Sequence, residues 1–208
     1  MKRLFDIFFS GLGLIFLTPL LLVIAVQIKV YDRGPLFYRG QRVGRNGKIF
    51  RIYKFRTMVV NAENIGGPST SDDDPRITPI GRWMRKYKLD ELPQLINVLK
   101  GEMSFVGPRP EVKVYTDMFT AEEKAILTVR PGITDLASLW NPDEGAVLAG
   151  SPDPEKTYRE KIRPEKIRLQ LRYVRERTFF KDLKIILLTL RSIAVRRTPH
   201  QFRHQDPS

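Results

Sequence analysis

The sequence predicts a mainly helical α+β protein whose N-terminus holds it at a membrane. Three observations support this prediction: an uncharged stretch over 7–28, two β-prone runs around a glycine-containing turn, and two basic helical segments near the C-terminus. The strands form a small β-hairpin, and the basic amphipathic helices are expected to lie at the membrane interface. We expect a membrane-associated helix over 1–30, a globular domain over 31–197 and a tail over 198–208.

The composition indicates a folded chain with an anionic partner. Hydrophobic residues make up 42% of the 208 residues, and the absence of cysteine excludes disulfides and thiolate metal sites. The net charge is +13, and the part from Lys156 onward holds 15 basic and 5 acidic residues. A surplus of this size implies nucleic acid, an acidic membrane surface or phosphorylated substrates as partners.

The hydrophobic stretch is long enough to cross a bilayer, which needs about 20 apolar residues. A cleaved signal peptide is disfavoured because no small-residue cleavage site follows. Thr18 and Pro19 lie near the middle, where proline kinks a helix and the threonine hydroxyl can satisfy a freed carbonyl. Basic residues flank both ends: Lys2 and Arg3 on one side, and Lys29, Arg33 and Arg39 on the other. The residues alone leave a crossing helix and a re-entrant helix equally open, although only the second keeps both flanks inside.

Two runs, Leu36 to Val43 and Lys48 to Thr57, predict the β-hairpin, with Gly44 to Gly47 as its turn. The second strand ends with Lys54 and Arg56, which are either a solvated face or two cations aimed at a phosphate. Further helices are predicted over Gly81–Lys88, Glu91–Leu99, Thr120–Val129, Glu155–Thr178 and Lys181–Arg197.

The last predicted helix has one apolar face and one basic face. Its basic residues, Lys184, Arg191, Arg196 and Arg197, could contact lipid headgroups; its apolar residues are Leu183, Ile186, Leu187, Leu190 and Ile193. A packed surface helix and a helix lying on the membrane both fit this pattern.

Two acidic clusters are interpreted as loops. Three consecutive carboxylates, Asp72 to Asp74, cannot all face one metal ion, and aspartate before proline is ordinary turn chemistry. The pair Asp143 and Glu144 is also assigned to a loop.

The segment Leu89 to Gln94 has the most specific chemistry in the chain. Asp90 stands where a helix N-cap is expected, with Pro93 in the first turn and Glu91 placed to complement the helix dipole. That structural interpretation competes with a functional one. A helix N-terminus also stabilises an ionised carboxylate and a phosphate, and an ionised aspartate can attack phosphorus.

Cations are close in sequence to these carboxylates. Arg85 lies about one turn before Asp90, and Arg109 is held between Pro108 and Pro110, which fix its backbone for bidentate phosphate binding. A divalent ion, Mg²⁺ by preference, would bridge Asp90 and a diphosphate.

Several motifs together resemble the bacterial sugar transferase family, the small monotopic phosphoglycosyl transferases. The similarity covers nearly the whole chain, to about residue 195. Its motifs are Leu89 to Gln94, Asn97 to Gly101, Met103 to Pro110, Arg130 to Thr134, Lys54 to Met58 and Asp74 to Thr78.

The resemblance implies an enzyme of the bacterial inner membrane that lies on its cytoplasmic face. Its first helix would be re-entrant, broken at Thr18-Pro19, and residues 31–197 would form the catalytic domain. Such enzymes move a phosphosugar from a nucleotide sugar, usually a UDP-sugar, to polyprenyl (undecaprenyl) phosphate and release UMP. This is the first membrane step in the assembly of O-antigen, capsule, exopolysaccharide or glycoprotein glycans.

The resemblance also implies roles for individual residues. Asp90 matches the nucleophile that forms a covalent phosphosugar intermediate, and Glu91 matches its partner in Mg²⁺ placement or the acceptor step. Basic positions around the phosphates and nucleotide are matched by Arg85, Arg109 and Arg130, with Lys54 and Arg56 as further candidates. The chain departs from the family pattern at Thr18, Lys88 and Asp135, the last two of which bear on donor specificity.

Two rival functions are also compatible with the sequence. A non-enzymatic, basic, membrane-anchored recruiting protein would suit the charge, although no nucleic-acid module is evident and nucleic acid is not expected as a partner. A membrane-anchored phosphohydrolase could use the same Asp90. The sugar and the oligomeric state, a homodimer included, are left open.

Overall fold

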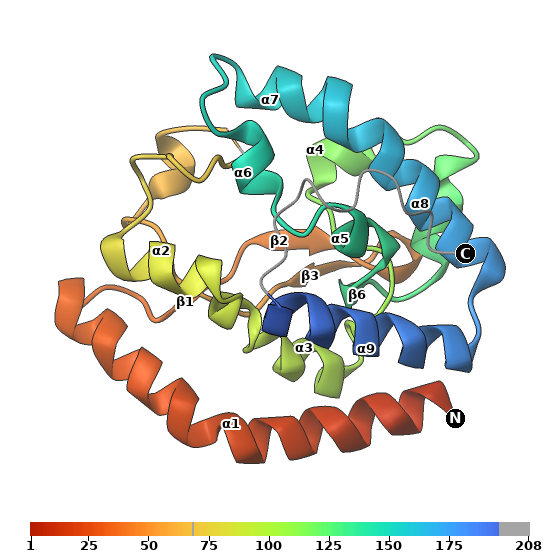
Figure 1. Cartoon of the computed structure of the whole chain (residues 1–208), viewed down its shortest axis with the longest axis horizontal. Helices are drawn as coiled ribbons and strands as arrows, with labels where there is room; N and C mark the ends of the chain where they lie inside the picture. Colours follow the sequence, from red (N-terminus) through yellow and green to blue (C-terminus); the bar gives the residue numbers. More distant parts are fainter. Residues whose placement is uncertain (68, 196–208) are drawn as a thin grey trace.

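A computed structural model describes residues 1–67 and 69–195 (Figure 1). The predicted tail over 198–208, together with Arg196 and Arg197, lies outside the described residues. The helices are α1 Lys2–Asp32, α2 Pro79–Lys86, α3 Gln94–Lys100, α4 Lys113–Thr116, α5 Leu136–Trp140, α6 Glu144–Leu148, α7 Pro154–Thr157, α8 Arg163–Glu176 and α9 Phe179–Val195. The strands are β1 Phe37–Tyr38, β2 Gln41–Val43, β3 Ile49–Arg51, β4 Lys54–Phe55, β5 Ser104–Val106 and β6 Gly132–Thr134. The protein is mainly helical, as predicted.

Helix α1 is long and apolar, and Figure 1 shows it bent near its middle beneath the rest of the molecule. Its length and composition would let it cross a membrane, and little of its most apolar part is buried against the protein. Pro19 lies inside the helix, and the Thr18 hydroxyl donates to the Leu14 carbonyl oxygen at 2.7 Å. The carbonyl that loses its helical donor to Pro19 is that of Ile15, four residues earlier, so the bond to Leu14 does not replace the missing one.

The N-terminal end of α1 is fastened to the globular domain. The Lys2 ammonium donates to the Val106 carbonyl oxygen at 2.8 Å and forms an ion pair with Asp182 of α9. Arg3 donates to the carbonyl oxygens of Val98 and Leu99, at the end of α3.

The C-terminal end of α1 is fastened to the same domain. Asp32, its last residue, pairs with the Arg56 guanidinium just after β4. The Arg56 Nε also donates to the Pro35 carbonyl oxygen at 2.6 Å. Both ends of one bent helix therefore contact one folded body.

The β-hairpin forms where the sequence predicts it. Strands β2 and β3 pair antiparallel, β1 pairs antiparallel with β4, and one helical turn over Arg45–Gly47 joins the inner strands. Asn46 and Gly47 have φ of 56° and 76°, the left-handed conformation that asparagine and glycine adopt most readily. Phe50 and Ile52 are buried against Val98 and Met103, which places α3 on one side of the hairpin.

The segment between α2 and α3 corrects one expectation. Thr78 caps α2 by accepting from the Gly81 amide at 3.0 Å, and the helix ends before Lys88, whose φ is 55°. Asp90 lies in a 3₁₀ turn over Leu89–Glu91, and α3 begins only at Gln94 with Pro93 as its N-cap. Asp90 is therefore not the N-cap of α3, because the chain makes a separate tight turn before that helix starts.

Strands β5 and β6 form a parallel pair that the sequence did not predict. The two backbones approach so closely at Gly132 that an added Cβ would lie 2.1 Å from the Gly107 amide nitrogen. This pairing sets the start of the segment that carries Arg109.

The C-terminal helices match the prediction in position. A continuous helical run joins α7, a short π-helical segment over Tyr158–Ile162, and α8. In α9, Ile185 is buried, whereas Leu187, Leu190 and Ile193 are 68%, 60% and 49% exposed. The outer apolar side of α9 thus has no cover among residues 1–67 and 69–195.

Candidate active site

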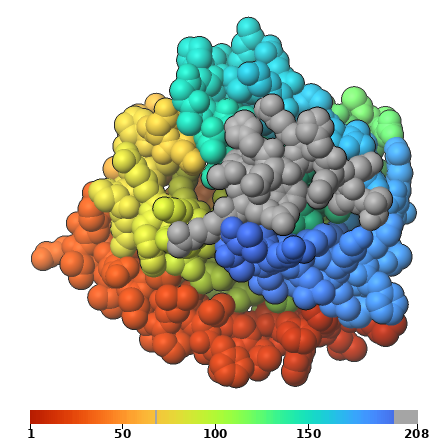
Figure 2. Space-filling model, in the orientation of Figure 1, coloured from red at the N-terminus to blue at the C-terminus, as the bar shows by residue number. Residues whose placement is uncertain are grey.

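An open cleft of about 1940 Å³ runs through the centre of the molecule. Figure 2 shows the surface hollowed between the yellow segment around α2 and the blue-green segment around α6. The lining includes Asp90, Glu91 and basic side chains from α2 and the hairpin. Apolar residues of α1 and α9, including Leu17 and Ile193, extend the cleft toward the exposed faces of those helices.

Asp90 is 4% exposed and lines this cleft. Its Oδ2 lies 3.3 Å from the Lys54 ammonium, which arrives from β4 of the hairpin. Its Oδ1 has no hydrogen-bond partner in the described part of the chain. A buried carboxylate oxygen without a partner is unfavourable on its own, so this atom is available to a cation or an electrophile.

Glu91 joins two cations. Its carboxylate accepts from Lys54 at 2.9 Å and is held by the Arg109 guanidinium through two hydrogen bonds, one of them at 3.2 Å to Oε2. Burial by itself would raise the pKa of Glu91, but the charges of Arg109 and Lys54 outweigh burial and hold that pKa well below its ordinary value. Glu91 is therefore ionised, and Lys54 is shared between both members of the acidic pair.

Arg109 is positioned through its backbone as well as its side chain. Its amide donates at 3.1 Å to the carboxylate of Asp135, a residue 0% exposed that also caps α5 by accepting from Ser138. The neighbouring Glu91 charge raises the pKa of Arg109 further above its ordinary value. The expected role of the two flanking prolines is thus supplemented by a buried carboxylate.

Arg85 approaches from α2, and its Nε donates to the Thr57 hydroxyl at 2.9 Å. Burial lowers the pKa of this guanidinium, and the charge of Asp90 is the largest influence opposing that shift. Arg85 therefore belongs to the same charged group as Asp90, Glu91, Lys54 and Arg109.

Two predicted phosphate ligands are engaged elsewhere. Arg56 lines the cleft, but its donors are taken by Asp32 and the Pro35 carbonyl. Arg130 donates its Nε to the Gly101 carbonyl oxygen at 2.8 Å, beyond the end of α3. Neither contacts Asp90 or Glu91, so their role in phosphate binding stays a prediction.

A second charged cluster was missed in the sequence. Lys166 of α8 is 4% exposed, and its ammonium lies 2.8 Å from Glu111 and 2.9 Å from Glu144. Glu144 begins α6, capped by Asp143, so the expectation of a loop at this acidic pair was wrong. The signal missed in the sequence was Asp143 as a helix N-cap, because its carboxylate accepts from the amide of Ala146, three residues later.

The described residues could hold one Mg²⁺ only together with phosphate oxygens of a bound ligand. No group of three or more acidic, histidine or cysteine side chains that could hold a metal occurs in the part of the chain that is described. The Asp72 to Asp74 run does not converge, since Asp74 pairs with Arg76 and Asp73 accepts from the Gly150 amide. Mg²⁺ is commonly held by one or two carboxylates plus substrate phosphates, which the free Oδ1 of Asp90 would fit.

A family model described as "Bacterial sugar transferase" matches residues 1–196. The chain belongs to the bacterial sugar transferase family. The cleft, which brings together an acidic pair, three cations and an apolar helix, agrees with membership of this family.

Curated relatives of this chain vary in length. It is 34% identical over 211 residues to the "Exopolysaccharide production protein ExoY" of Sinorhizobium fredii, covering 94% of this chain and 86% of that protein. It is 38% identical to "Galactosyl transferase CpsE" of Streptococcus agalactiae, covering 92% of this chain but 42% of that protein. A "UDP-glucose:undecaprenyl-phosphate glucose-1-phosphate transferase" of Klebsiella pneumoniae is 37% identical over 91% of this chain and 39% of its own length. The chain thus spans less than half of several relatives that it matches.

Proposed function

We propose that the protein transfers a sugar-1-phosphate from a UDP-sugar to undecaprenyl phosphate, through a covalent intermediate on Asp90. The observation that carries the proposal is a buried carboxylate that lines the cleft, with Lys54 beside one oxygen and, among the described residues, no partner at the other. The printed names of relatives, such as the Klebsiella pneumoniae enzyme, support the donor and acceptor classes. This transfer would be the first membrane step of glycan assembly.

In the first step an Asp90 oxygen attacks the phosphorus that bears the sugar. A bond forms between that oxygen and phosphorus, and the bond to the second phosphate breaks, so UMP leaves with the electron pair. Lys54 orients the carboxylate and offsets charge that would otherwise repel the diphosphate. The hydrogen bond from Arg85 Nε to Thr57 orients the guanidinium group. The terminal nitrogens of Arg85 are the candidates to bind the leaving phosphate.

In the second step a phosphate oxygen of the lipid acceptor attacks the same phosphorus. The bond to Asp90 breaks, and the carboxylate is regenerated with the lipid diphosphosugar as product. Glu91 and Arg109 hold each other in place at this point of the cleft. The apolar lining from α1 and α9 offers a route by which a lipid phosphate could reach Asp90 from the membrane.

Mg²⁺ is part of the proposal. When bound, it would neutralise diphosphate charge and polarise the phosphoryl oxygens, with Asp90 Oδ1 as its protein ligand. Without a divalent ion, the two carboxylates and the diphosphate would repel one another despite the nearby cations of the chain.

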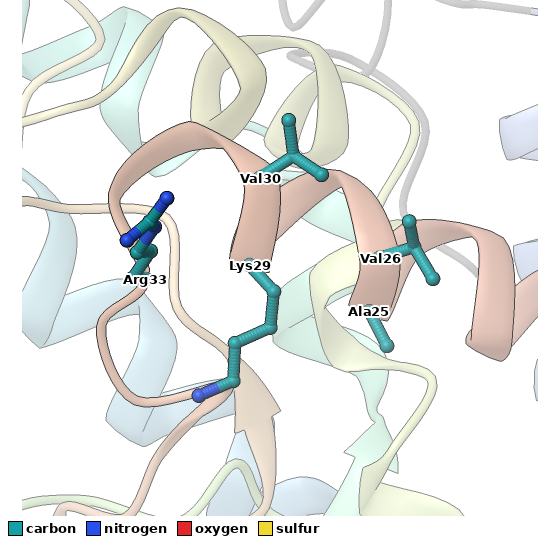
Figure 3. Close-up of a pocket in the computed structure, with 5 residues that line it drawn as sticks. All are labelled: Ala25, Val26, Lys29, Val30 and Arg33. Atoms are coloured by element: carbon teal, nitrogen blue, oxygen red, sulfur yellow. The ribbon is translucent and has the colours of Figure 1, made fainter.

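We also propose that α1 enters the cytoplasmic leaflet of the bacterial inner membrane and returns, so that the enzyme is monotopic. The support is that both ends of α1 bind the globular domain, through Lys2 with Asp182 and through Asp32 with Arg56. Figure 3 shows Lys29 and Arg33 at the C-terminal end of the apolar stretch, and basic residues prefer the cytoplasmic side. The bend at Pro19 would then lie deepest in the lipid.

The deciding experiment is UMP release by the purified protein in lipid with Mg²⁺, a panel of UDP-sugars and undecaprenyl phosphate. We expect release with at least one donor, and a loss of at least about 10³-fold in Asp90→Asn, because the amide cannot act as the nucleophile. Denatured protein should retain label from the sugar phosphate in the wild type but not in Asp90→Asn. Normal turnover by Asp90→Asn would exclude the covalent mechanism, and sugar phosphate released without acceptor would indicate a hydrolase.

A further inference from the structure

Asn141 is a buried amide that lines the active-site cleft. It is 7% exposed, and neither its Oδ1 nor its Nδ2 has a hydrogen-bond partner within residues 1–67 and 69–195. A side-chain amide offers two donors and one acceptor, and leaving all of them unpaired away from water is unfavourable. Such a group requires an explanation, and a bound ligand is one that fits a residue lining a cleft.

The backbone around Asn141 is fixed. The backbone N–H of Asn141 donates to the Ala137 carbonyl oxygen at 2.8 Å. This bond closes the C-terminal end of α5, and Pro142 follows Asn141 in the chain. Farther along, the Gly145 carbonyl oxygen accepts from the Asp72 amide at 3.1 Å. An added Cβ at Gly145 would lie 2.1 Å from Asp72 Oδ1, so this wall of the cleft is closely packed.

This wall stands on the Arg109 side of the acidic pair. Glu144, three residues after Asn141, shares the Lys166 ammonium with Glu111, which follows Arg109 by two residues, and Arg109 holds Glu91 directly. The cleft therefore has a cationic part, formed by Lys54, Arg85 and Arg109, and a neutral-to-acidic part at Asn141.

A phosphate is suited to the cationic part and disfavoured at the other. Asp143, Glu144 and Glu111 line this part of the cleft, and the single Lys166 ammonium is shared by the two glutamates, so negative charge is in excess there. This excess would repel an anion, whereas a neutral hydroxyl group can donate to a carboxylate. An amide that can donate and accept matches a sugar hydroxyl, which also donates and accepts. A neutral polyhydroxyl group joined to a phosphate fits these two parts of the cleft together.

We propose that Asn141 hydrogen-bonds hydroxyl groups of the donor sugar and helps determine which sugar is accepted. This inference rests on the proposed transferase function. It assigns Asn141 to the sugar and leaves the nucleotide diphosphate to the cations.

The test compares wild type, Asn141→Ala and Asn141→Gln with Asn64→Ala as a matched control. Asn64 is exposed and is the same residue type. The purified full chain in lipid is assayed for UMP release from UDP-glucose, UDP-galactose and their N-acetylated counterparts, and UDP is assayed as a competitive inhibitor. Thermal melting shows whether each variant is folded.

For Asn141→Ala we expect kcat/KM for the best donor to fall by at least about tenfold and the preference over other donors to shrink, because a bond specific to that sugar is lost. Inhibition by UDP should stay unchanged. Asn141→Gln, which moves the amide by one methylene, should also reduce the preference, and Asn64→Ala should match wild type.

Unaltered donor preference in both Asn141 variants would overturn the inference, as would an equal loss with every donor accompanied by weaker UDP inhibition. In either case wild-type turnover would leave the transferase proposal intact. If the wild type releases UMP from none of the donors, the transferase proposal fails and the inference fails with it.

Discussion

At the scale of single residues, Glu91 is the group whose loss should affect the fold most directly. Its side chain is 13% exposed and lies between Lys54 and Arg109. Glu91→Gln leaves Arg109 without its anion and Lys54 with Asp90 alone, and removal of one partner from a buried pair typically costs about 3–5 kcal/mol. We expect a clear fall in the thermal midpoint and in the free energy of unfolding, measured in detergent or nanodiscs.

Asp117→Asn is the matched control. Asp117 pairs with Lys113, but those side chains are 58% and 71% exposed, and water screens such a pair. Its replacement should leave the thermal midpoint nearly unchanged. An equal shift in both variants would show that Glu91 contributes no more than a surface ion pair.

The contribution of Glu91 should also depend on pH in a defined direction. Because the folded protein holds the pKa of Glu91 well below the ordinary value of 4.5, the charged form favours folding at any pH above that ordinary value. The contribution is lost as the pH falls from 4.5 through the lower, folded pKa. The difference in unfolding free energy between wild type and Glu91→Gln should therefore be constant near neutrality and shrink in acid. A difference that grows in acid would contradict the assignment.

The residues of the acidic pair and two of its cations could be found in the sequence because Asp90, Glu91, Arg85 and Arg109 lie in short, dense motifs. Lys54 was also found, although its contact with Asp90 depends on how the hairpin packs. Lys166 could not be found. Its partners lie 22 and 55 positions away, and no periodic pattern marks a lysine that is buried by a fold-level contact.

At the scale of elements, the β5–β6 pair should be the one least tolerant of a small change. A Cβ at Gly132 would meet the Gly107 amide nitrogen at 2.1 Å, which is far inside van der Waals contact. We expect Gly132→Ala to force the strands apart and destabilise the protein by about 1–3 kcal/mol, the usual cost of overpacking. Activity should fall too, because Arg109 follows β5 by three residues.

Gly67→Ala serves as the control for this element, since nothing lies within 4 Å of a Cβ added there. Thermal melting of the two variants, with UMP release by each, checks the prediction. If Gly132→Ala melted like Gly67→Ala, the close approach of the strands would not be a constraint in the native protein.

Local patterns predicted some elements well and others not at all. The hairpin was predictable because alternating β-prone residues surround a turn whose Asn46 and Gly47 adopt positive φ. The β5–β6 pair was not, because each strand has three residues and its partner is 28 positions away in the register Ser104 to Gly132. The start of α3 was misplaced because proline is acceptable both at an N-cap and in a first turn, and only the tight turn at Leu89–Glu91 separates the two.

At the scale of the whole molecule, the attachment of α1 at both ends restricts how the protein can sit in a membrane. A straight helix of 31 residues would be about 46 Å long, enough to cross a bilayer core of about 30 Å. The contacts of Arg3 with the end of α3 and of Asp32 with Arg56 instead hold both ends against one globular body. A crossing helix would have to break one set of contacts and leave charged groups unpaired.

The absence of cysteine makes this topology directly testable with single-cysteine variants. Leu4→Cys and Tyr31→Cys place thiols at opposite ends of α1, at side chains that are 73% and 53% exposed, and Phe16→Cys places one near the bend at a side chain 74% exposed. In intact spheroplasts a membrane-impermeant maleimide should label none of the three. In inverted vesicles it should label the two end positions but not residue 16, which would lie in lipid. Labelling of Leu4→Cys from outside the spheroplasts, with Tyr31→Cys reactive only in inverted vesicles, would establish a crossing helix, and the contacts of Lys2 and Arg3 with the globular domain could then not exist in the membrane.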